Sequence, residues 1–138
     1  MFVYIKKAQY HETDQMGIIH HANYIKWMEE ARLAYLEELG FGYKQVENEH
    51  VFSPVVNVSV QYKSPVRFAD EIAINVSVKR YTDVKLELAY EFFNKTTNQL
   101  CATATSLHCF IKKGKIISLK RDMPTLHERI SRLIFHKE

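Results

Sequence analysis

A carboxylate, a glycine and two adjacent histidines crowd one short stretch near the start of the chain, YHETDQMGIIHHANY. Asp14 precedes a predicted helix by a few residues, and Gly17 allows the backbone to turn sharply and to approach a ligand closely. The first turn of that helix, around His21 to Tyr24, leaves backbone N–H groups without helical partners at the positive end of the helix dipole. A carboxylate facing such N–H groups across the space of an acyl carbon could perform acyl transfer.

Two other interpretations of this stretch remain open from the residues alone. Asp14 could simply cap a turn that Gly17 shapes. His11, Asp14, His20 and His21 could also supply metal ligands, but adjacent histidines project in different directions, and the spacing matches no HExxH or Cys/His zinc pattern. We therefore expect no metal site. The sequence also contains no Gly-x-Ser-x-Gly elbow and no phosphate-binding glycine loop.

The residues after this stretch predict one long amphipathic helix of about four turns. Its apolar side is formed by Tyr24, Trp27, Met28, Ala31, Tyr35 and Leu39. Its polar side carries Lys26, Glu29, Glu30 and Glu37. Gly40 follows the last periodic residue, where a left-handed helix end is most accessible to glycine, so we expect the helix to stop there. The aromatic side chains of this helix are expected in the core.

Most of the remaining chain alternates with a period of two, which is typical of strands. Four such runs occupy residues 55–62, 72–78, 84–92 and 101–111, and residues 2–11 supply an N-terminal strand. In the last of the four runs, the face predicted to continue the apolar pattern consists of Cys101, Thr103, Thr105, Leu107, Cys109 and Ile111. After Pro124 a terminal helix through residue 138 is expected, with Leu126, Ile130, Leu133 and Ile134 in contact. The layout predicts one α+β domain over residues 1–138, with an antiparallel sheet laid against one main helix.

The composition is that of an ordinary globular protein, with 46% hydrophobic and 25% charged residues. A formal net charge of +3 is far from that of a dedicated nucleic-acid binder, so no nucleic acid is expected as a partner. No run approaches the roughly 18 apolar residues that a membrane span requires, and Lys6 and Lys7 interrupt the N-terminal apolar run, so we expect a cytoplasmic protein. Cys101 and Cys109 are predicted to be free, packed thiols.

Two motifs resemble those of a known family. The segment HETDQMGIIHHANYIKWMEEARLAYLEELG is similar to the signature of the 4-hydroxybenzoyl-CoA thioesterase-like hotdog family. Within this family, the segment especially resembles the branch of small bacterial acyl-CoA thioesterases that includes the Tol-Pal-associated members. The segment YKSPVRFADEI resembles a second element of the family, and the likeness extends over nearly the whole chain. The resemblance implies a hotdog fold, a curved antiparallel sheet wrapped around one long helix.

The resemblance also implies roles for individual residues. Asp14 matches the catalytic carboxylate of the family, and the backbone N–H of His21 matches the group that polarises the thioester carbonyl. His20 departs from the family, which commonly has tyrosine or tryptophan at this position. The residues predicted to bind substrate are Gly17, His20, Tyr24, Asn57, Lys63 and Arg67. Lys63 and Arg67 flank Ser64-Pro65 in a polar segment that joins two strands, where side chains reach solvent, so their positive charges could contact the anionic CoA phosphates. The alternative is that both are ordinary surface charges.

The leading hypothesis is an acyl-CoA thioesterase that needs no metal or organic cofactor and uses Asp14 as nucleophile or as general base. Two alternatives remain. One is a hotdog hydratase or dehydratase in which His20 or His11 transfers protons, and the other is a non-catalytic acyl-CoA binding module. Apolar residues opposite the predicted core face, Ala73, Ala89, Phe93, Ala102, Ala104 and Phe110, suggest a partner. The resemblance implies a homodimer or homotetramer with shared sites, in which Asp14 faces the segment Ser53–Asn57 of the other chain.

Overall fold

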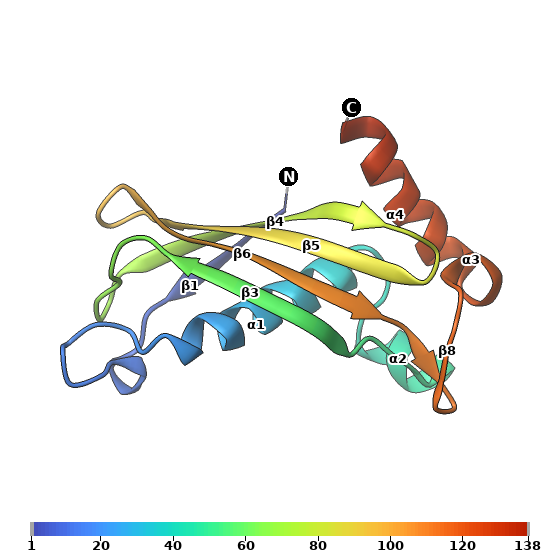
Figure 1. Cartoon of the computed structure of the whole chain (residues 1–138), viewed down its shortest axis with the longest axis horizontal. Coiled ribbons are helices and arrows are strands. Elements are labelled where there is room, and N and C mark those ends of the chain that lie inside the picture. Colours follow the sequence, from blue (N-terminus) through green and yellow to red (C-terminus); the bar gives the residue numbers. More distant parts are fainter. Residues whose placement is uncertain (1, 138) are drawn as a thin grey trace. The chain divides into compact units, whose positions relative to one another are not determined.

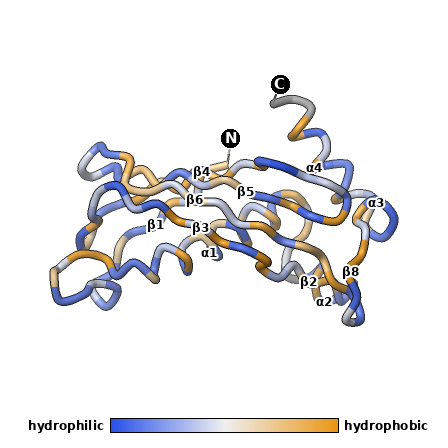
Figure 2. Tube along the Cα trace, viewed as in Figure 1, coloured by the Kyte–Doolittle hydropathy of each residue, from blue (hydrophilic) through white to orange (hydrophobic). Residues whose placement is uncertain are grey.

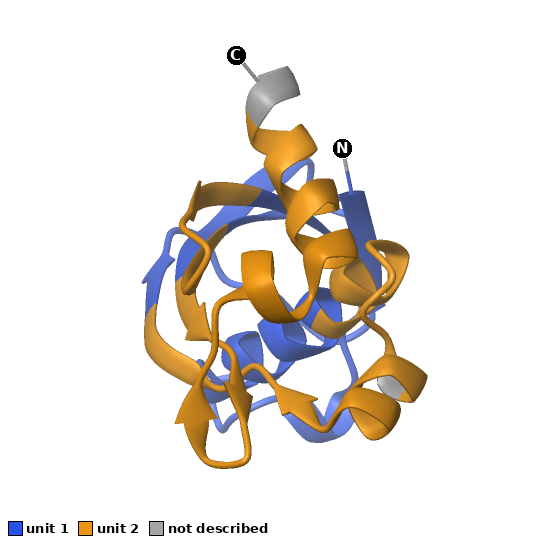
Figure 3. Cartoon of the chain, turned by 90° about the vertical axis from the view of Figure 1, so that its right-hand side faces the viewer, with its two compact units in different colours: residues 1–32, 59–77, 89–105 blue, residues 33–58, 78–88, 106–138 orange. Residues whose placement is uncertain are grey.

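The computed structural model of the protein describes residues 2–137, apart from the side chains of Tyr43, Phe135, His136 and Lys137. Met1 and Glu138, both included in the predicted domain, lie outside the described residues. The chain divides into two compact units, each assembled from three separate segments (Figure 3). Unit 1 comprises Met1–Arg32, Ser59–Ser77 and Ala89–Thr105, and unit 2 comprises Leu33–Val58, Val78–Leu88 and Ser106–Glu138. The prediction of a single domain over residues 1–138 stays a prediction.

The described residues form the predicted α+β arrangement (Figure 1). The helices are η1 (Tyr10–Glu12, a 3-10 turn), α1 (Ala22–Glu38), α2 (Tyr43–Glu49), α3 (Leu119–Asp122) and α4 (Pro124–Lys137). The strands are β1 (Phe2–Lys7), β2 (Val51–Phe52), β3 (Val55–Tyr62), β4 (Glu71–Tyr81), β5 (Lys85–Asn94), β6 (Gln99–Cys109), β7 (Ile111–Lys112) and β8 (Lys115–Ile116). One sheet has the order β1-β4-β5-β6-β3, and a smaller one has the order β2-β7-β8.

The long helix α1 matches the sequence prediction in position and in orientation. All six residues of its predicted apolar side are buried. In unit 1 the ring of Tyr24 lies 5.6 Å from that of Phe92 on β5, so this part of the helix packs on the sheet. After the helix, Gly40 has a φ of +91°, the left-handed conformation expected for its end. A Cβ at Gly40 would also meet the guanidinium of Arg129, which donates a 2.8 Å hydrogen bond to the carbonyl of Leu39.

Strands β4 and β5 bury the faces that their alternation predicts. The buried residues are Ile72, Ile74, Val76 and Val78 on β4, and Leu86, Leu88, Tyr90 and Phe92 on β5. In unit 1, β1 pairs antiparallel with β4, with Tyr4 opposite Ile74. The predicted N-terminal strand over residues 2–11 ends at Lys7, because residues 10–12 turn into the 3-10 helix η1.

The predicted face of β6 is wrong. Its consistently buried residues are Ala102, Ala104, Ser106 and His108, whereas Thr103, Thr105 and Leu107 on the predicted face are only partly buried. Small and weakly polar residues alternate along this strand, so transfer energies differ too little to favour one face over the other. Consequently Ala102, Ala104 and Phe110, which had suggested a partner surface, lie in the core. Both cysteines are free and buried, as predicted.

Strand β3 has no such buried face. It stands at one edge of the five-stranded sheet, and part of its length is drawn in the hydrophobic colour in Figure 2. Val55, Val56, Val58 and Tyr62 are exposed on it, so its apolar alternation does not mark a core face within this chain. At the other edge of the sheet, Val3 and Ile5 of β1 are exposed as well.

The terminal helix α4 begins at Pro124 as predicted, but its predicted contacts are only partly present. Leu126 and Ile130 are buried, whereas Leu133 is exposed. Within unit 2 the imidazole of His127 and the hydroxyl of Tyr81 form a 2.6 Å hydrogen bond, which attaches α4 to β4. In the part of the chain that the structure describes, no helix is both long and apolar enough to cross a bilayer.

Candidate active site

Asp14 starts a tight turn that its own carboxylate stabilises. Its backbone N–H donates to the carbonyl of Ile18 at 2.8 Å, and its carbonyl accepts the N–H of Gly17 at 3.0 Å. The carboxylate oxygen Oδ1 accepts the N–H of Met16 at 2.8 Å. Gly17 has a φ of +77°, so the sharp turn predicted at this glycine is present. Among the described residues no donor reaches the second carboxylate oxygen, Oδ2, which stays available for chemistry.

The start of α1 supplies backbone N–H groups next to the Asp14 turn. The imidazole nitrogen Nδ1 of His20 accepts the N–H of Ala22 at 3.2 Å, and the carbonyls of His20 and His21 accept the next two N–H groups. Within residues 2–137 the backbone N–H of His21 donates to no acceptor. The rings of His20 and His21 stack with centroids 4.3 Å apart. His20 thus caps the helix, and the N–H of His21 remains free to bind a ligand.

Both segments border one pocket in unit 1. The pocket has a volume of about 430 Å³, and Asp14, His21, Tyr24 and Lys63 line it together with Tyr62 and apolar side chains of the turn. Tyr24 is buried and meets Tyr62 edge to face at 4.9 Å. Burial raises the pKa of the Tyr24 hydroxyl, and Cys101 and Tyr62 add to the effect, so this hydroxyl stays protonated.

Four predicted site residues do not line this pocket. Gly17 shapes the turn, and the ring of His20 stacks on the ring of His21, which does line the pocket. Arg67 has an exposed side chain, although its backbone forms a bridge with Ile18. Asn57 is exposed on β3 and belongs to unit 2. The roles of all eight predicted residues therefore stay predictions, of which four share one pocket.

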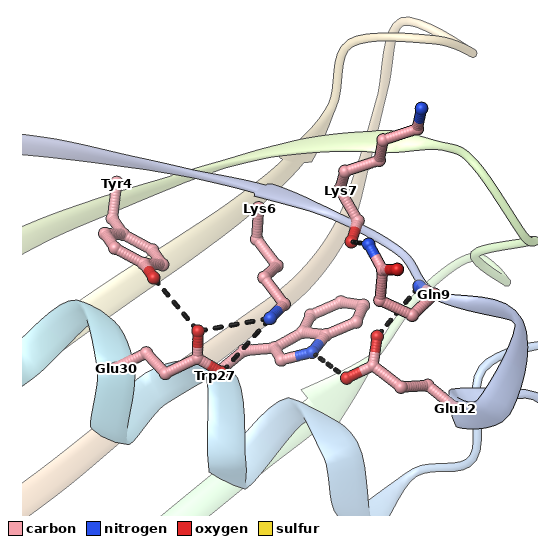
Figure 4. Close-up of polar contacts among 7 residues, drawn as sticks. All are labelled: Tyr4, Lys6, Lys7, Gln9, Glu12, Trp27 and Glu30. Atoms are coloured by element: carbon pink, nitrogen blue, oxygen red, sulfur yellow. Dashed lines mark hydrogen bonds and ion pairs between the residues drawn. The ribbon is translucent and has the colours of Figure 1, made fainter.

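Two residues that sequence reasoning missed hold the site together. The hydroxyl of Tyr62 donates a 2.9 Å hydrogen bond to the carbonyl of His21. The carboxylate of Glu12 is buried, and it accepts the indole N–H of Trp27 at 2.8 Å (Figure 4). The only sequence signal for Glu12 is its place as a charged residue two positions before Asp14. Nothing in the strand alternation distinguishes Tyr62.

The histidines and carboxylates of this region do not converge on a common point. Across the described residues no three His, Cys, Asp or Glu side chains lie close enough together to hold a metal ion. The groups that the pocket offers are a carboxylate, backbone N–H groups, a lysine and phenol hydroxyls. This set can attack or deprotonate at one side of a carbonyl and stabilise negative charge at the other.

Comparison with known proteins gives consistent matches. The family described as "Thioesterase-like superfamily" matches residues 8–129. The Bacillus subtilis (strain 168) protein named "Putative acyl-CoA thioesterase YneP" is 36% identical over 123 residues, which are 88% of this chain and 88% of that protein. A protein of Aquifex aeolicus (strain VF5) named "Putative esterase" is 30% identical over 122 residues, 88% of this chain and 94% of its own.

A solved structure shows the same fold. It is named "Novel crystal structure of DHNA-CoA Thioesterase from Staphylococcus aureus", and its TM-score to this chain is 0.92 with 34% sequence identity. The match covers 98% of this chain and 91% of that one. The predicted α+β hotdog fold, with a curved antiparallel sheet and a long helix, is confirmed by this likeness.

Proposed function

Since the chain belongs to the thioesterase-like superfamily, we propose that it hydrolyses an acyl-CoA thioester to a carboxylic acid and CoA in the pocket beside Asp14. The enzyme class predicted from the sequence, a thioester hydrolase, is confirmed by this membership and by the names of the relatives. The substrate, the residue roles and the assembly are proposals. The branch of the family suggested by the motifs, that of 4-hydroxybenzoyl-CoA thioesterase and the Tol-Pal-associated proteins, also stays a prediction.

One observation supports the proposal above the others. The Asp14 carboxylate and the His21 backbone, whose N–H has no acceptor among the described residues, border the same pocket from two separate segments. The turn amide of Met16 fixes Oδ1, which leaves Oδ2 as the reactive oxygen. A thioester carbonyl held between these groups would have a carboxylate near its carbon and a donor near its oxygen.

The reaction needs no group beyond those of the chain and water. If Asp14 is the nucleophile, Oδ2 bonds to the acyl carbon, the C–S bond breaks, and the CoA thiolate takes a proton. Water then cleaves the mixed anhydride. If Asp14 is the general base, Oδ2 takes a proton from water, which attacks the acyl carbon directly. In both routes the His21 N–H stabilises the negative oxygen of the intermediate.

An assembly of two or more copies is part of the proposal. The exposed valines of β3 lie on a sheet edge, where unpaired backbone groups and apolar side chains favour pairing with another strand. A second copy paired at this edge would bring its own Asn57 close to the interface. We therefore retain the predicted homodimer or homotetramer with shared sites, and the cytoplasm as the predicted location.

A thiol-trapping assay tests the function. The protein is incubated with short-chain, long-chain and aromatic acyl-CoAs, and released CoA is measured with a thiol reagent. If the protein is a thioesterase, at least one acyl-CoA of the panel is hydrolysed, and one CoA thiol is released for each molecule of acid formed. Loss of the enoyl absorbance of an enoyl-CoA without thiol release would instead identify a hydratase. Saturable binding of acyl-CoAs without any turnover would identify a binding module.

A further inference from the structure

We propose that Glu12 is a positioning residue that fixes the gap between the Asp14 carboxylate and the backbone N–H of His21. The inference rests on the proposed function, because that gap is where the thioester would bind. Glu12 belongs to the turn η1, two residues before Asp14, and His21 precedes the first residue of α1. One residue therefore connects the two segments that supply the reacting groups.

The side chain of Glu12 makes the first connection. Its carboxylate is buried, with 7% of the residue exposed. Oε2 accepts the indole N–H of Trp27 at 2.8 Å, and Oε1 accepts the backbone N–H of Gln9 at 2.9 Å (Figure 4). Trp27 is fully buried in the second turn of α1, so its indole cannot follow a moving carboxylate. The bond therefore ties η1 to a rigid part of the helix.

The backbone of Glu12 makes the second connection. Its carbonyl accepts the N–H of His20 at 2.9 Å and the side-chain amide of Asn23 at 2.9 Å. These donors come from the residue before His21 and from the second residue after it. The free N–H of His21 is thus held between two bonds to one carbonyl oxygen.

These four bonds are not needed to close the Asp14 turn. That turn is closed by its own bonds to Ile18 and Gly17, and Thr13 forms a bridge with Ile19. Glu12 instead links the closed turn to the helix. Glu30, a carboxylate of α1 itself, links the helix to β1 instead, because it accepts the hydroxyl of Tyr4 and pairs with Lys6 (Figure 4).

The substitution Glu12→Gln keeps the shape of the side chain but removes one acceptor. A carboxylate can accept from Trp27 and Gln9 at once, whereas an amide presents one oxygen and an NH₂ group, which cannot accept either N–H. One of the two bonds must therefore break. Since a displacement of about 1 Å between reacting groups can cost about 100-fold in rate, the effect should appear in kcat.

The experiment compares three variants with the wild type, with the best acyl-CoA of the panel as substrate. Glu12→Gln weakens the side-chain connection, and Asn23→Ala removes one of the two bonds to the Glu12 carbonyl. Tyr4→Phe is the matched control, because it removes a 2.9 Å side-chain bond to the same helix that does not involve η1. We expect kcat to fall about 10- to 100-fold for the first two, with KM changed less than about threefold. For Tyr4→Phe both constants should stay within about twofold.

Two spectroscopic readouts accompany the kinetics and do not depend on activity. Trp27 is the only tryptophan, so its indole N–H gives a single cross-peak that reports the bond to Glu12. The amide of His20 reports the carbonyl bond through its hydrogen exchange. In Glu12→Gln we expect the indole peak to shift and the His20 amide to exchange at least about tenfold faster.

The outcomes separate this inference from the proposed function. A Glu12→Gln protein with a shifted indole peak and wild-type kcat would overturn the positioning role, as would a variant in which only KM or only thermal stability changes. If the wild type hydrolyses none of the acyl-CoAs, the proposed function fails. The link between η1 and the helix is then judged by exchange alone, and an unchanged His20 amide in Glu12→Gln would overturn it.

Discussion

The hydroxyl of Tyr62, at the end of β3, donates a 2.9 Å hydrogen bond to the carbonyl of His21, the residue whose own N–H has no acceptor among residues 2–137. A side chain of the sheet therefore holds the carbonyl of His21. The carbonyl of Glu12 in η1 holds the N–H of His20 and the side-chain amide of Asn23, on either side of His21. The segment proposed to polarise the substrate is thus fixed from two directions. Each connection can be removed separately.

Tyr62→Phe should lower kcat/KM about three- to tenfold with little change in stability. A single partly exposed hydrogen bond contributes about 0.5–1.5 kcal/mol, and nearly half of the Tyr62 surface is exposed. Steady-state kinetics and thermal denaturation check both effects. Tyr10→Phe is the matched control, since the Tyr10 hydroxyl makes no hydrogen bond among the described residues. An equal loss of activity in both variants would contradict a specific role for Tyr62.

Asp14→Asn should reduce kcat by at least about 100-fold and leave the fold intact. The amide oxygen can still accept the N–H of Met16, so the turn persists, but the side chain neither attacks a thioester nor accepts a proton. The measurements are turnover of the best acyl-CoA and the circular dichroism spectrum. More than about a tenth of the wild-type kcat would remove Asp14 from its role. In the wild type, a single turnover in ¹⁸O-labelled water that puts label into the Asp14 carboxylate would favour the anhydride route, because general-base catalysis does not label that carboxylate.

The sequence predicts the large elements well because their signals are local. The 3.6-residue period of α1 places six side chains correctly in the core, and Gly40 marks the end of the helix. The weaker elements carry weaker signals. The seven-residue helix α2 has no long period, and it ends at His50, a non-glycine residue with a φ of +55°. On β6 the alternation is real, but the similar side chains on its two faces do not identify the buried one.

The site divides in the same way. Asp14, Gly17 and His21 lie close together in the sequence, so their spacing alone predicts a turn and a helix start. The bond between Glu12 and Trp27 joins residues 15 apart, and the bond between Tyr62 and His21 joins residues 41 apart. Such contacts depend on how the elements pack. Sequence patterns can therefore suggest candidate reacting groups, but they do not reveal the distant residues that hold those candidates in place.

Lys63 should assist binding of the CoA phosphates, whereas Arg67 should matter less than the sequence predicts. Lys63 lines the pocket beside Asp14, and the exposed side chain of Arg67 does not. Lys63→Gln is expected to raise KM about two- to fivefold at 10 mM salt and less at 300 mM, because salt screens exposed charges. Lys7→Gln, which removes an exposed lysine of β1, is the charge-matched control. A KM that does not depend on Lys63 at low salt would exclude this role.

The folded state should lose stability at alkaline pH in two steps. Burial raises the pKa of the Cys101 thiol from 9.0 to about 11, and burial with the nearby Asp83 carboxylate raises that of Tyr81 from 10.0 to about 12. Both groups lose their protons first in the unfolded chain, so their stabilisation is complete below pH 9 and falls as pH rises to 11 and 12. Urea denaturation should show that the free energy of unfolding falls by on the order of 1–2 kcal/mol between pH 9 and 11 because of Cys101.

Two variants serve as controls for these steps: Cys101→Ala should remove the first step and Tyr81→Phe the second. A free energy of unfolding that is constant from pH 8 to 11 would contradict this account.

The exposed edge of β3 predicts that the chain is not monomeric. Val56 is 54% exposed on an edge strand, so a charge placed there should oppose pairing with another copy. Val56→Asp is expected to shift the sedimentation coefficient toward that of a monomer and to reduce kcat/KM at least tenfold, because the proposed shared site would be lost. Val3→Asp introduces the same charge on the opposite edge strand and serves as the control. A Val56→Asp monomer with full activity would show that each chain builds its own site.

Subunit complementation tests whether the site is shared. In the proposed dimer each site combines Asp14 of one chain with the Asn57 region of the other. An Asp14→Asn chain refolded with an Asn57→Trp chain would then form mixed dimers in which one site carries both changes and the other carries neither. Since random mixing makes about half of the dimers mixed, activity should recover to about a quarter of the wild-type value. Each parent alone should be inactive, and mixing the two without unfolding should restore nothing until the subunits exchange. If purified mixed dimers remain inactive, Asn57 does not act across the interface, and the pocket beside Asp14 in unit 1 must bind the acyl group without the partner strand.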